Sequence, residues 1–560
     1  MTGNQTVAVL GGGIGGLTAA HELGNRGVDV TVYEHNDRFG GKARSMPGPR
    51  DGGAALPAEH GFRFVPGFYQ HLPDTMRRIP TDRGSVLDHL VSTETMLQSV
   101  VDGPSREFPL ATPRTVSQIR ERVQHVVHSQ VPRDEAAFFA NRLLTMLTSG
   151  DHRWDTEYEQ TSWWEFVRAD EMSPAYQTFL GYGLTQSLVA MRPEVSSART
   201  IGRIYLQMIR GLFDPALDAD RLLDGPTNDR FIDPWVAHLR DQGVTLHTNA
   251  TVTGIDSDGH RVSGVAVQFD DGEAAETRQV TADHYVLAVP GDVVCRLLTP
   301  DLCAAAPLLA GVRDLDRGWM NGVQFYLREG LRDLGGHGVF YDAPWALTAV
   351  SQRQFWPDHD FDAYDDCEGV LSVIVSEWDT PGILYGKPAR ECEPPELLDE
   401  VWAQLQAHLG EDTLRDDDRL DAHLDPALSW DSERGGLRND STLLVNTVDT
   451  RQHRPVAATD CPNLVLAADY VRTETDLASM ESANEAGRRA ASAVLDRTGW
   501  TGDRPELWDF EWPAVVEPLR RQDDRASKLG LPHIGTTGDP LWDAYRQVGR
   551  TGVLGRFFSR

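Results

Sequence analysis

Glycines near the N-terminus have the spacing that a phosphate-binding turn requires. Residues 7–17 read Val-Ala-Val-Leu-Gly-Gly-Gly-Ile-Gly-Gly-Leu, a short apolar run followed by glycines and the start of a helix. Gly11 permits the tight turn, Gly13 lets the backbone approach a pyrophosphate, and Gly16 lets the helix pack closely on the strand. The free N–H groups of a helix N-terminus favour an anion at this place. We assign the contacts of this turn to Gly11, Gly13, Ile14, Gly15 and Gly16.

An acidic residue follows at the distance expected for a dinucleotide site. The apolar run 28–33 predicts a second strand, and it ends in Glu34, 18 positions after Gly16. A carboxylate here accepts hydrogen bonds from ribose hydroxyls, and it disfavours a 2′-phosphate. The pattern therefore favours FAD or NAD over NADP, although an ordinary strand-turn-helix without a ligand stays open at this point.

Composition and charge restrict the class of protein. The 560 residues are enough for about two to four units. With 84 acidic residues against 53 Lys and Arg, the net charge is -31, which argues against nucleic acid or a strongly anionic membrane as an overall partner. The oligomeric state is left open.

Cysteine usage and hydropathy indicate a reducing compartment. Five scattered cysteines without a C-x-x-C pair predict neither a disulfide framework nor a zinc site. We expect no metal site, because His125 and His128 have no third ligand at a recognisable spacing. Residues 1–6 do not begin like a secretory signal, and no apolar run is long enough to span a bilayer. We therefore expect a cytoplasmic protein, at most peripheral to a membrane.

Two further segments carry a family resemblance. Residues 38–42 have the pattern R-x-G-G-K, and residues 59–69 have the pattern E-x-G-x-R-F-x-x-G-x-Y. Together with the glycine turn and Glu34, they resemble the N-terminal part of flavin amine oxidases and phytoene desaturase-type enzymes, in which the cofactor is FAD. Adjacent glycines bring the backbone close to a cofactor. The predicted cofactor contacts in these segments are Gly41, Lys42, Gly61 and Phe62.

Two cations in these segments are candidates for electrostatic roles. Lys42 and Arg63 supply positive charge near a phosphate or near the electron-rich end of a reduced flavin. The resembling family often has arginine where Lys42 stands, which makes a bidentate phosphate contact less certain here. For Arg63, our only candidate catalytic residue, a surface salt bridge is the alternative; no residue is recognised as a general base.

The C-terminal half predicts a third part of the cofactor site. The apolar run 463–468 predicts a strand before Asp469, and a helix with small residues on one face is expected to begin near Ser479. Free amides near Met480 can stabilise negative charge on a reduced flavin. The resemblance implies that Asp469 binds the ribityl or phosphate part of FAD and that the backbone of Val252 holds the adenine edge. Simple core packing is the alternative for both elements.

These segments predict an α/β fold with a Rossmann-like FAD-binding domain built from separated pieces and a mixed α+β substrate domain. Residues 1–75, 228–296 and 436–500 are assigned to the FAD-binding domain, and residues 76–227 and 297–435 to the substrate domain. Apolar spacing predicts helices within 116–131, 135–147, 163–169 and 175–188. Residues 176–191 either line an apolar pocket or pack in the core. The extension 501–560 holds aromatic and basic residues, and we expect it to be loosely packed.

The resemblance is nearest to the hydroxysqualene dehydroxylase and carotene desaturase branch of the family. It implies an FAD-dependent oxidoreductase that transfers a hydride between the flavin and a small lipophilic substrate, an isoprenoid or polyene. The FAD is expected to be noncovalent, because no cysteine lies in a segment like the family's attachment site. Three alternatives stay open: oxidation of an amine or amino acid, a redox-neutral flavin-dependent isomerase, and a noncatalytic FAD-binding scaffold. A peripheral membrane contact through the basic and aromatic tail is also left open.

Overall fold

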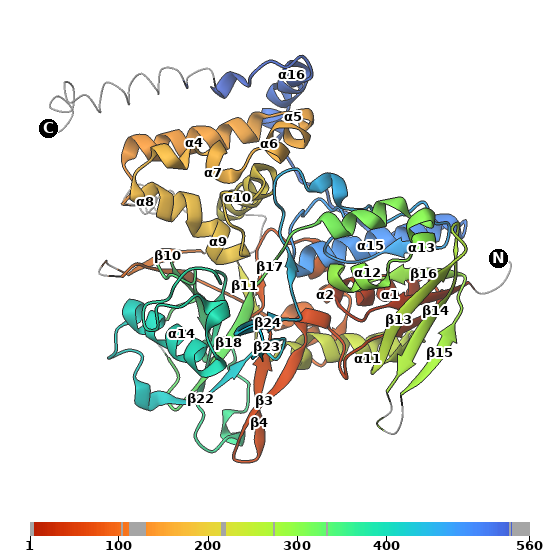
Figure 1. Ribbon diagram of the computed structural model, residues 1–560, viewed down its shortest axis with the longest axis horizontal. Coiled ribbons are helices and arrows are strands. Elements are labelled where there is room, and N and C mark those ends of the chain that lie inside the picture. Colours follow the sequence, from red (N-terminus) through yellow and green to blue (C-terminus); the bar gives the residue numbers. More distant parts are fainter. Residues whose placement is uncertain are drawn as a thin grey trace.

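The structure is a computed structural model (Figure 1). It describes residues 5–536 and 539, except for 102, 104, 111–129, 214–219, 271, 273, 274, 332 and 333. The helix expected within 116–131, with His125 and His128, therefore lies almost wholly outside the described residues.

Five of the described strands form a parallel sheet that begins with the N-terminal strand. Its order is β12-β2-β1-β16-β26, and every neighbouring pair is parallel. The strands come from three distant parts of the chain: β1 (Thr6–Leu10), β2 (Asp29–Tyr33), β12 (Thr245–His247), β16 (His284–Leu287) and β26 (Leu464–Leu466). This sheet confirms the Rossmann-like fold class. It places the carboxyl ends of these separated strands along one edge.

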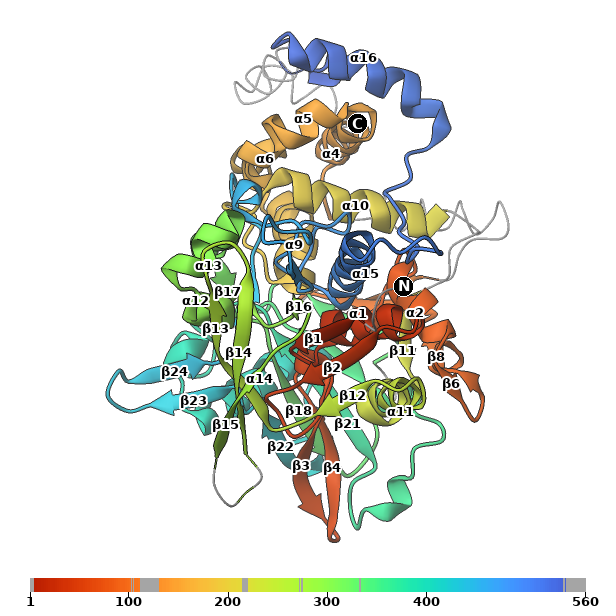
Figure 2. The same cartoon turned by 90° about the vertical axis from the view of Figure 1, so that its right-hand side faces the viewer.

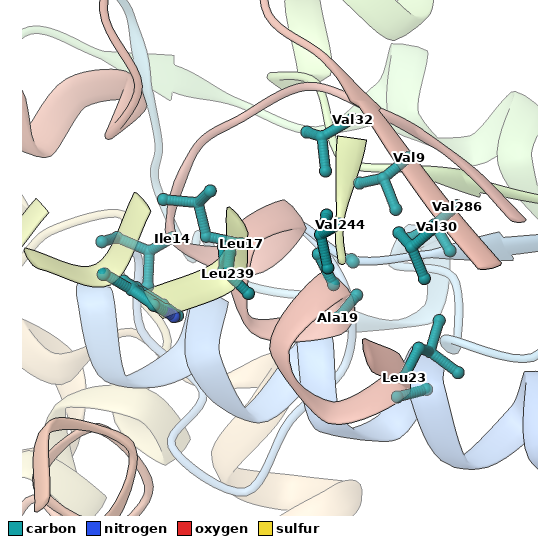
Figure 3. Close-up of a cluster of buried hydrophobic side chains, with 14 of the residues drawn as sticks. Val9, Ile14, Leu17, Ala19, Leu23, Val30, Val32, Leu239, Val244 and Val286 are labelled. Carbon is teal, nitrogen blue, oxygen red and sulfur yellow. The ribbon is translucent and has the colours of Figure 1, made fainter. Parts of the chain in front are cut away.

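Alternation along β1 separates the two hydrophobic faces of this sheet, since successive side chains of a strand point to opposite sides. Val7 and Val9 pack with α1 (Ile14–Gly24), α11 (Asp233–Asp241) and α15 (Met480–Arg497). Figure 3 shows Val9, Val32 and Val286 of the sheet beside Leu17 and Leu23 of α1. The helices α1 and α15 approach closely, because a Cβ on Gly487 of α15 would lie 2.5 Å from the Gly15 carbonyl oxygen. This confirms that α15 has a face of small side chains, as the sequence predicts.

The opposite face of the sheet packs on an antiparallel unit. Ala8 and Leu10 contact a second core that includes side chains of the three-stranded sheet β13-β14-β15. Its strands are β13 (Ala250–Ser257), β14 (Val262–Phe269) and β15 (Glu276–Val280), followed by the helices α12 (Gly291–Leu297) and α13 (Pro300–Ala305). The antiparallel unit thus covers the face of the parallel sheet opposite α1, α11 and α15.

A second, larger sheet lies below the helical part in Figure 1. Seven described strands have the order β10-β9-β19-β20-β21-β18-β22, and all pairs are antiparallel except β9 with β19. They are β9 (Thr95–Ser99), β10 (Arg106–Pro109), β18 (Asn321–Leu327), β19 (His337–Phe340), β20 (Thr348–Ser351), β21 (Gly369–Val375) and β22 (Arg419–Leu424). The helix α14 (Pro394–Leu409) packs on it through Leu397, Val401 and Leu405. Apolar side chains of β18 and β21 belong to the same buried cluster as these three residues.

The helices that lie between β10 and β11 in the chain gather on one side of the molecule (Figure 2). They are α4 (Arg133–Thr148), α5 (Asp151–Asp155), α6 (Glu157–Gln160), α7 (Trp163–Phe166), α8 (Pro174–Tyr176), α9 (Gly183–Val189) and α10 (Ala198–Phe213). A π-helical turn, Gln177–Tyr182, joins α8 to α9. Where the sequence predicted one continuous helix over 175–188, the structure has three short pieces in one run.

The expectation of a loosely packed C-terminal extension is wrong for its first part. Phe510 and Trp512 pack against the core of the helical part, and Trp512 lies 5.6 Å from Trp154 between ring centroids. The helix α16 (Glu517–Lys528) is held by Asp523, whose carboxylate accepts hydrogen bonds from Arg153, 2.9 Å from its Nη2. Aromatic burial and this ion pair explain the ordered packing. Within the extension, residues 537, 538 and 540–560 lie outside the described residues.

Shorter elements complete the described fold. They are α2 (His71–Arg77), β3 (Ser45–Asp51), β4 (Ala54–Glu59), β5 (Phe64–Val65), β6 (Pro80–Thr81), β7 (Gly84–Ser85), β8 (Leu90–Ser92), β11 (Arg221–Leu223), β17 (Arg317–Gly318), β23 (Leu428–Asp431), β24 (Gly436–Asn439) and β25 (Leu443–Leu444). None of the helices in the described part of the chain has the length and apolar character needed to cross a bilayer.

Candidate active site

One large cavity joins the parallel sheet, the seven-stranded sheet and the helical part. Its volume is about 1570 Å³, beyond the roughly 300–1000 Å³ typical of a site for one small ligand. The lining comes from segments as distant as Gly11, Val252 and Met480. The cavity therefore has room for a dinucleotide together with a second molecule.

The glycine turn forms one wall of this cavity. Gly11, Gly13, Ile14 and Gly15 line it, whereas Gly16 lies behind the turn. A Cβ on Gly16 would be 1.9 Å from the Gly11 carbonyl oxygen, and a Cβ on Gly13 would meet only the Cα of Gly41, at 3.7 Å. Gly16 thus serves close packing, while Gly13 leaves open space toward the cavity, as the separate roles predicted for these glycines require.

Glu34 fastens the turn to the end of β2. Its carboxylate accepts hydrogen bonds from the backbone N–H of Gly12, at 2.7 Å, and of Asn36, at 2.9 Å. The side chain is buried yet contributes to the cavity lining. Glu34 therefore stands at the predicted place and also has a structural role that the sequence did not reveal.

The segment around Gly41 lies directly against the glycine turn. The N–H of Gly40 donates to the Gly12 carbonyl, at 2.9 Å, and Gly41 has a φ of +59°, in the left-handed region. A Cβ on Gly41 would lie 2.9 Å from the Cα of Gly13. The adjacent glycines therefore permit two backbone segments to meet beside the cavity.

The two predicted cations both line the cavity. The Lys42 ammonium donates to the carbonyl of Thr442, and the Arg63 Nη2 donates to the carbonyl of Lys42, at 2.7 Å. Burial lowers the pKa of Arg63 from its ordinary value. Among the described residues Arg63 forms no ion pair within 4 Å, so the surface salt bridge considered for it is wrong.

A helix N-terminus forms another wall. Ser479 caps α15 by accepting a hydrogen bond from the Ser482 N–H, at 3.2 Å, and Ser479, Met480 and Ala483 line the cavity. Asp469 follows β26 and also lines it; within the described chain its carboxylate has no hydrogen-bond partner. The cavity thus combines free amides of an 18-residue helix with an unpaired carboxylate.

The remaining predicted contacts also border the cavity. Val252 in β13 lines the cavity, and so do Gly61 and Phe62, which are consecutive in the chain. The structure therefore brings all fourteen predicted site residues into one region, with Gly16 alone outside the lining.

The far part of the cavity is mostly apolar. We call it the hydrophobic chamber and define it by side chains of β9, β10 and the residue after it, α4, the π-helical turn, α9 and α10 that line the cavity. They are Met96, Phe108, Leu110, Phe139, Leu143, Phe179, Leu180, Leu188, Ile204 and Met208. Within 176–191, Phe179 and Leu188 line this chamber, whereas Met191 is buried in the helical core. Both interpretations offered for that stretch are therefore correct for different residues.

Two polar side chains border the chamber. Gln98 donates to the Tyr341 hydroxyl, at 3.2 Å, and burial raises the pKa of Tyr341 to about 12. His337 lies between Phe62 and Phe64, with ring centroids 5.1 and 5.0 Å away, and burial lowers its pKa to about 4. Both groups are therefore uncharged at neutral pH.

Sequence reasoning missed a polar cluster in the cavity wall. The His60 imidazole Nδ1 pairs with the buried carboxylate of Asp425, which also accepts a hydrogen bond from the Asn321 side chain, at 2.6 Å. His60 lies inside the segment 59–69, which carries the family resemblance. His60 and Asp425 are 365 positions apart, and no sequence periodicity links them.

No metal centre is found within the described ranges. These residues contain no group of three or more His, Cys, Asp or Glu placed to hold an ion. The five cysteines are free, and none of them belongs to the described lining of the cavity.

Comparison with known proteins decides the family. The profile of the flavin containing amine oxidoreductase family matches residues 14–495. The chain belongs to this family. A member of similar length is the 15-cis-phytoene desaturase of Synechococcus elongatus, 23% identical over 516 residues, which cover 88% of this chain and 96% of that protein.

Other members of the flavin containing amine oxidoreductase family match over shorter stretches. The carotenoid phi-ring synthase of Streptomyces griseus is 39% identical over 80 residues, 14% of this chain and 16% of that protein. The hydroxysqualene dehydroxylase of Sinorhizobium fredii is 35% identical over 82 residues, 15% of this chain and 19% of that protein.

Solved structures of two amine oxidases show the same fold. Putrescine oxidase has a TM-score of 0.58 and 15% identity, covering 88% of this chain and 99% of its own. Cyclohexylamine oxidase from Brevibacterium oxydans has a TM-score of 0.57 and 16% identity, covering 89% of this chain and 100% of its own. The protein is thus an FAD-dependent oxidoreductase. The open backbone at Gly13, the unpaired Asp469 and the N-terminus of α15 suit this cofactor.

Proposed function

We propose that the enzyme acts on a lipophilic isoprenoid or polyene substrate as a desaturase or dehydroxylase. The observation that carries the proposal is the hydrophobic chamber, which opens from the same cavity as the glycine turn. Apolar walls bind a hydrocarbon chain by removing its surface from water, at about 25 cal/mol per Å². The desaturase, phi-ring synthase and dehydroxylase relatives support this substrate class.

We assign the two ends of the cavity to two partners. Glu34 would accept hydrogen bonds from the ribose hydroxyls of FAD, the backbone of Val252 would hold the adenine edge, and Asp469 would bind the ribityl or phosphate part. The amides at Met480 and the cation of Arg63 would stabilise negative charge on the reduced flavin. When bound, FAD supplies hydride transfer. The division into an FAD-binding domain and a substrate domain, with the boundaries predicted above, is part of this proposal.

The chain's own residues orient the substrate and exclude water. Side chains such as Phe179 and Leu180 would hold the hydrocarbon in one position, and positioning of this kind contributes strongly to rate. Tyr341, already accepting a hydrogen bond from Gln98, keeps its own proton to donate to an oxygen on the substrate.

Oxidation of an amine or amino acid is the second candidate. It draws support from the flavin-dependent L-tryptophan oxidase of Lentzea aerocolonigenes, 35% identical over 77 residues, 14% of this chain and 16% of that protein. Two carboxylates of the lining are already engaged: Asp220 bonds the Gly67 N–H, at 2.9 Å, and Asp425 bonds His60. Because both carboxylates are occupied, they are poorly suited to hold a substrate ammonium group.

Product analysis separates these candidates. Incubation of the holoenzyme with 15-cis-phytoene and with putrescine, followed by mass spectrometry and peroxide assay, should give a product two mass units lighter from phytoene. Peroxide with putrescine alone would favour the amine oxidase. A phytoene product of unchanged mass would favour the redox-neutral isomerase.

A peripheral membrane contact is consistent with a lipophilic substrate, and we propose it for the C-terminal extension. Large apolar side chains on this segment are exposed: Val515, Leu519, Leu529, Leu531 and Ile534. Because the net charge is -31, vesicles of neutral phosphatidylcholine are the suitable probe. Cosedimentation that is lost on changing Val515 and Leu529 to Glu would support the contact, and unchanged cosedimentation would contradict it.

A further inference from the structure

Several histidines of the described chain pair with carboxylates, and the pair of His60 with Asp425 lines the main cavity. His71 pairs with Glu481 and His89 with Asp224, in each case away from the main cavity, whereas His60 and Asp425 both line it. The His60 side chain is 16% exposed and that of Asp425 only 2%. Accessible imidazole and buried carboxylate are the arrangement in which one group exchanges protons and the other orients it.

The hydrogen bonding of the second ring nitrogen, Nε2, distinguishes His60 from His71. In His71, Nδ1 bonds Glu481, at 2.9 Å, and Nε2 accepts the Trp508 N–H, at 3.1 Å, so both ring nitrogens are used. In His60 Nδ1 bonds Asp425, and Nε2 has no hydrogen-bond partner among the residues that the structure describes. The pair at His71 is therefore complete, and the pair at His60 has an unused ring nitrogen at the cavity wall.

The contacts of Asp425 favour its ionised form, and this form fixes the tautomer of the His60 imidazole. Burial raises its pKa, but the hydrogen bond and charge of His60, the Ala427 N–H and Asn321 outweigh burial and leave the pKa below its ordinary value. The Ala427 N–H lies 3.0 Å from one oxygen, and the Asn321 Nδ2 lies 2.6 Å from the other. An ionised carboxylate accepts only, so neutral His60 carries its proton on Nδ1 and its lone pair on Nε2.

The backbone on both sides of His60 is fixed as well. The Glu59 N–H donates to the Gln324 side chain, at 2.8 Å. Gly322 of β18 approaches so closely that a Cβ there would lie 2.5 Å from the His60 carbonyl oxygen. Next in the chain come Gly61 and Phe62, which also line the cavity. His60 therefore directly follows the end of β4, where its backbone packs against β18.

We propose that His60, oriented by Asp425, accepts the proton that the substrate loses in the oxidation; this step rests on the proposed function. One C–H bond breaks and its electron pair leaves as hydride to FAD, so the substrate is oxidised and the flavin reduced by two electrons. The neighbouring C–H bond breaks, its proton goes to Nε2 of His60, and its electron pair forms the new C=C bond. Asp425 stabilises the imidazolium that results.

Flavin reduction in variants of the holoenzyme tests this step. With 15-cis-phytoene in anaerobic stopped flow, H60Q should reduce its flavin about 10²–10⁴-fold more slowly than the wild type, the usual contribution of a general base. H89Q, which removes the ring of a histidine outside the cavity, should retain the wild-type rate. If wild type and H60Q bleach equally fast, His60 is not the base; if phytoene does not bleach the wild type, the desaturase form of the proposed function falls together with this step.

Chemical rescue separates proton transfer from a structural role. Substituted imidazoles of similar size should restore the rate of H60A in proportion to their basicity, as general-base catalysis requires. A rescue that follows size and ignores basicity would show that the ring only fills space, and would overturn the proposal.

Chemical modification of the wild-type protein tests the proposal without turnover, and it applies even if H60Q and H60A both misfold. Diethyl pyrocarbonate acts on unbonded imidazole nitrogens, so in the wild-type holoenzyme peptide mass spectrometry should find His60 carbethoxylated and His71 unmodified. An unmodified His60 would contradict the free, cavity-facing Nε2 on which the proposal depends.

Discussion

The two ends of the cavity are built by different means. At the glycine turn, backbone meets backbone: a Cβ on Gly15 would lie 2.0 Å from the Ala467 carbonyl oxygen, and Glu34 is tied to Gly12. In the hydrophobic chamber, side chains from six elements meet, and few polar groups fix them. The first end tolerates almost no change in shape, whereas the second can vary its side chains without losing the fold.

This contrast explains what the amino-acid sequence predicted and what it did not. The turn, Glu34, Asp469 and the start of α15 depend on local signals: glycine spacing, a strand end and an N-cap serine. All of them lie where the pattern placed them. The fold class and the strands of the parallel sheet follow from the same local periodicity.

The chamber and the polar cluster depend on tertiary contacts instead. Met96 of β9 and Leu180 of the π-helical turn line the same cavity from positions 84 residues apart, and their spacing contains no signal for this. His60 meets Asp425 only because β18 packs on β4 and β22 packs on β3, the strand that pairs with β4. The packed C-terminal extension was missed for the same reason, since Trp512 finds its partner Trp154 far away in the chain.

The largest effect should come from the glycine turn, where substitutions at two sites three positions apart separate an effect on folding from an effect on cofactor binding. G16A should destabilise the protein by about 3 kcal/mol or more, because its Cβ would meet the Gly11 carbonyl oxygen at 1.9 Å. G13A should leave the apoprotein folded and weaken FAD binding about 100-fold, or about 2.8 kcal/mol, because its methyl group enters the cavity. Circular dichroism and flavin fluorescence titration measure the two effects. If G16A were as stable as the wild type, or if G13A bound FAD with wild-type affinity, the separate roles given to these two glycines would be contradicted.

A buried ion-pair cluster connects the two ends. Asp476 pairs with Arg199 of α10, on the chamber side, and with Arg454, at 2.6 Å, and all three side chains are buried. D476N should lower the free energy of unfolding by about 3–5 kcal/mol, since it leaves two guanidinium groups under-compensated. D366N, in the exposed pair with Arg328, is the matched control and should change stability by less than about 1 kcal/mol.

The same cluster predicts a dependence on pH. Burial raises the pKa of Asp476, but Arg199 and Arg454 outweigh it and hold the pKa below its ordinary value. Its stabilisation is therefore present above the unfolded-state pKa of about 4 and is lost as the pH falls further, through the folded-state value. Urea unfolding between pH 7 and pH 3 should show wild type and D476N converging at the acid end. A constant difference across that range would contradict this sign.

A pair of neighbouring leucines tests the chamber alone. Leu143 lines the cavity, whereas Leu144, next to it on α4, is 54% exposed. L143D should lower kcat/KM for 15-cis-phytoene about 10–100-fold, or about 1.4–2.8 kcal/mol, with FAD content unchanged. L144D should behave as wild type. Equal losses in both variants would show that α4 acts through stability and not through the chamber.

The smallest effect is expected at Glu34. E34Q keeps the shape of the side chain but weakens the charge-assisted hydrogen bonds to Gly12 and, in our assignment, to ribose. FAD affinity should fall about tenfold, or about 1.4 kcal/mol, measured by fluorescence titration of the apoprotein. An affinity equal to wild type would restrict Glu34 to its structural contact with the turn.

Anaerobic mixing of the purified flavoprotein with substrates tests the central claim most directly. Oxidised holoenzyme should lose its flavin absorbance with 15-cis-phytoene, or dithionite-reduced holoenzyme should regain it with hydroxysqualene, and putrescine should leave the spectrum unchanged. Bleaching by putrescine, with no change from either isoprenoid, would contradict the assignment of the chamber to a lipophilic substrate.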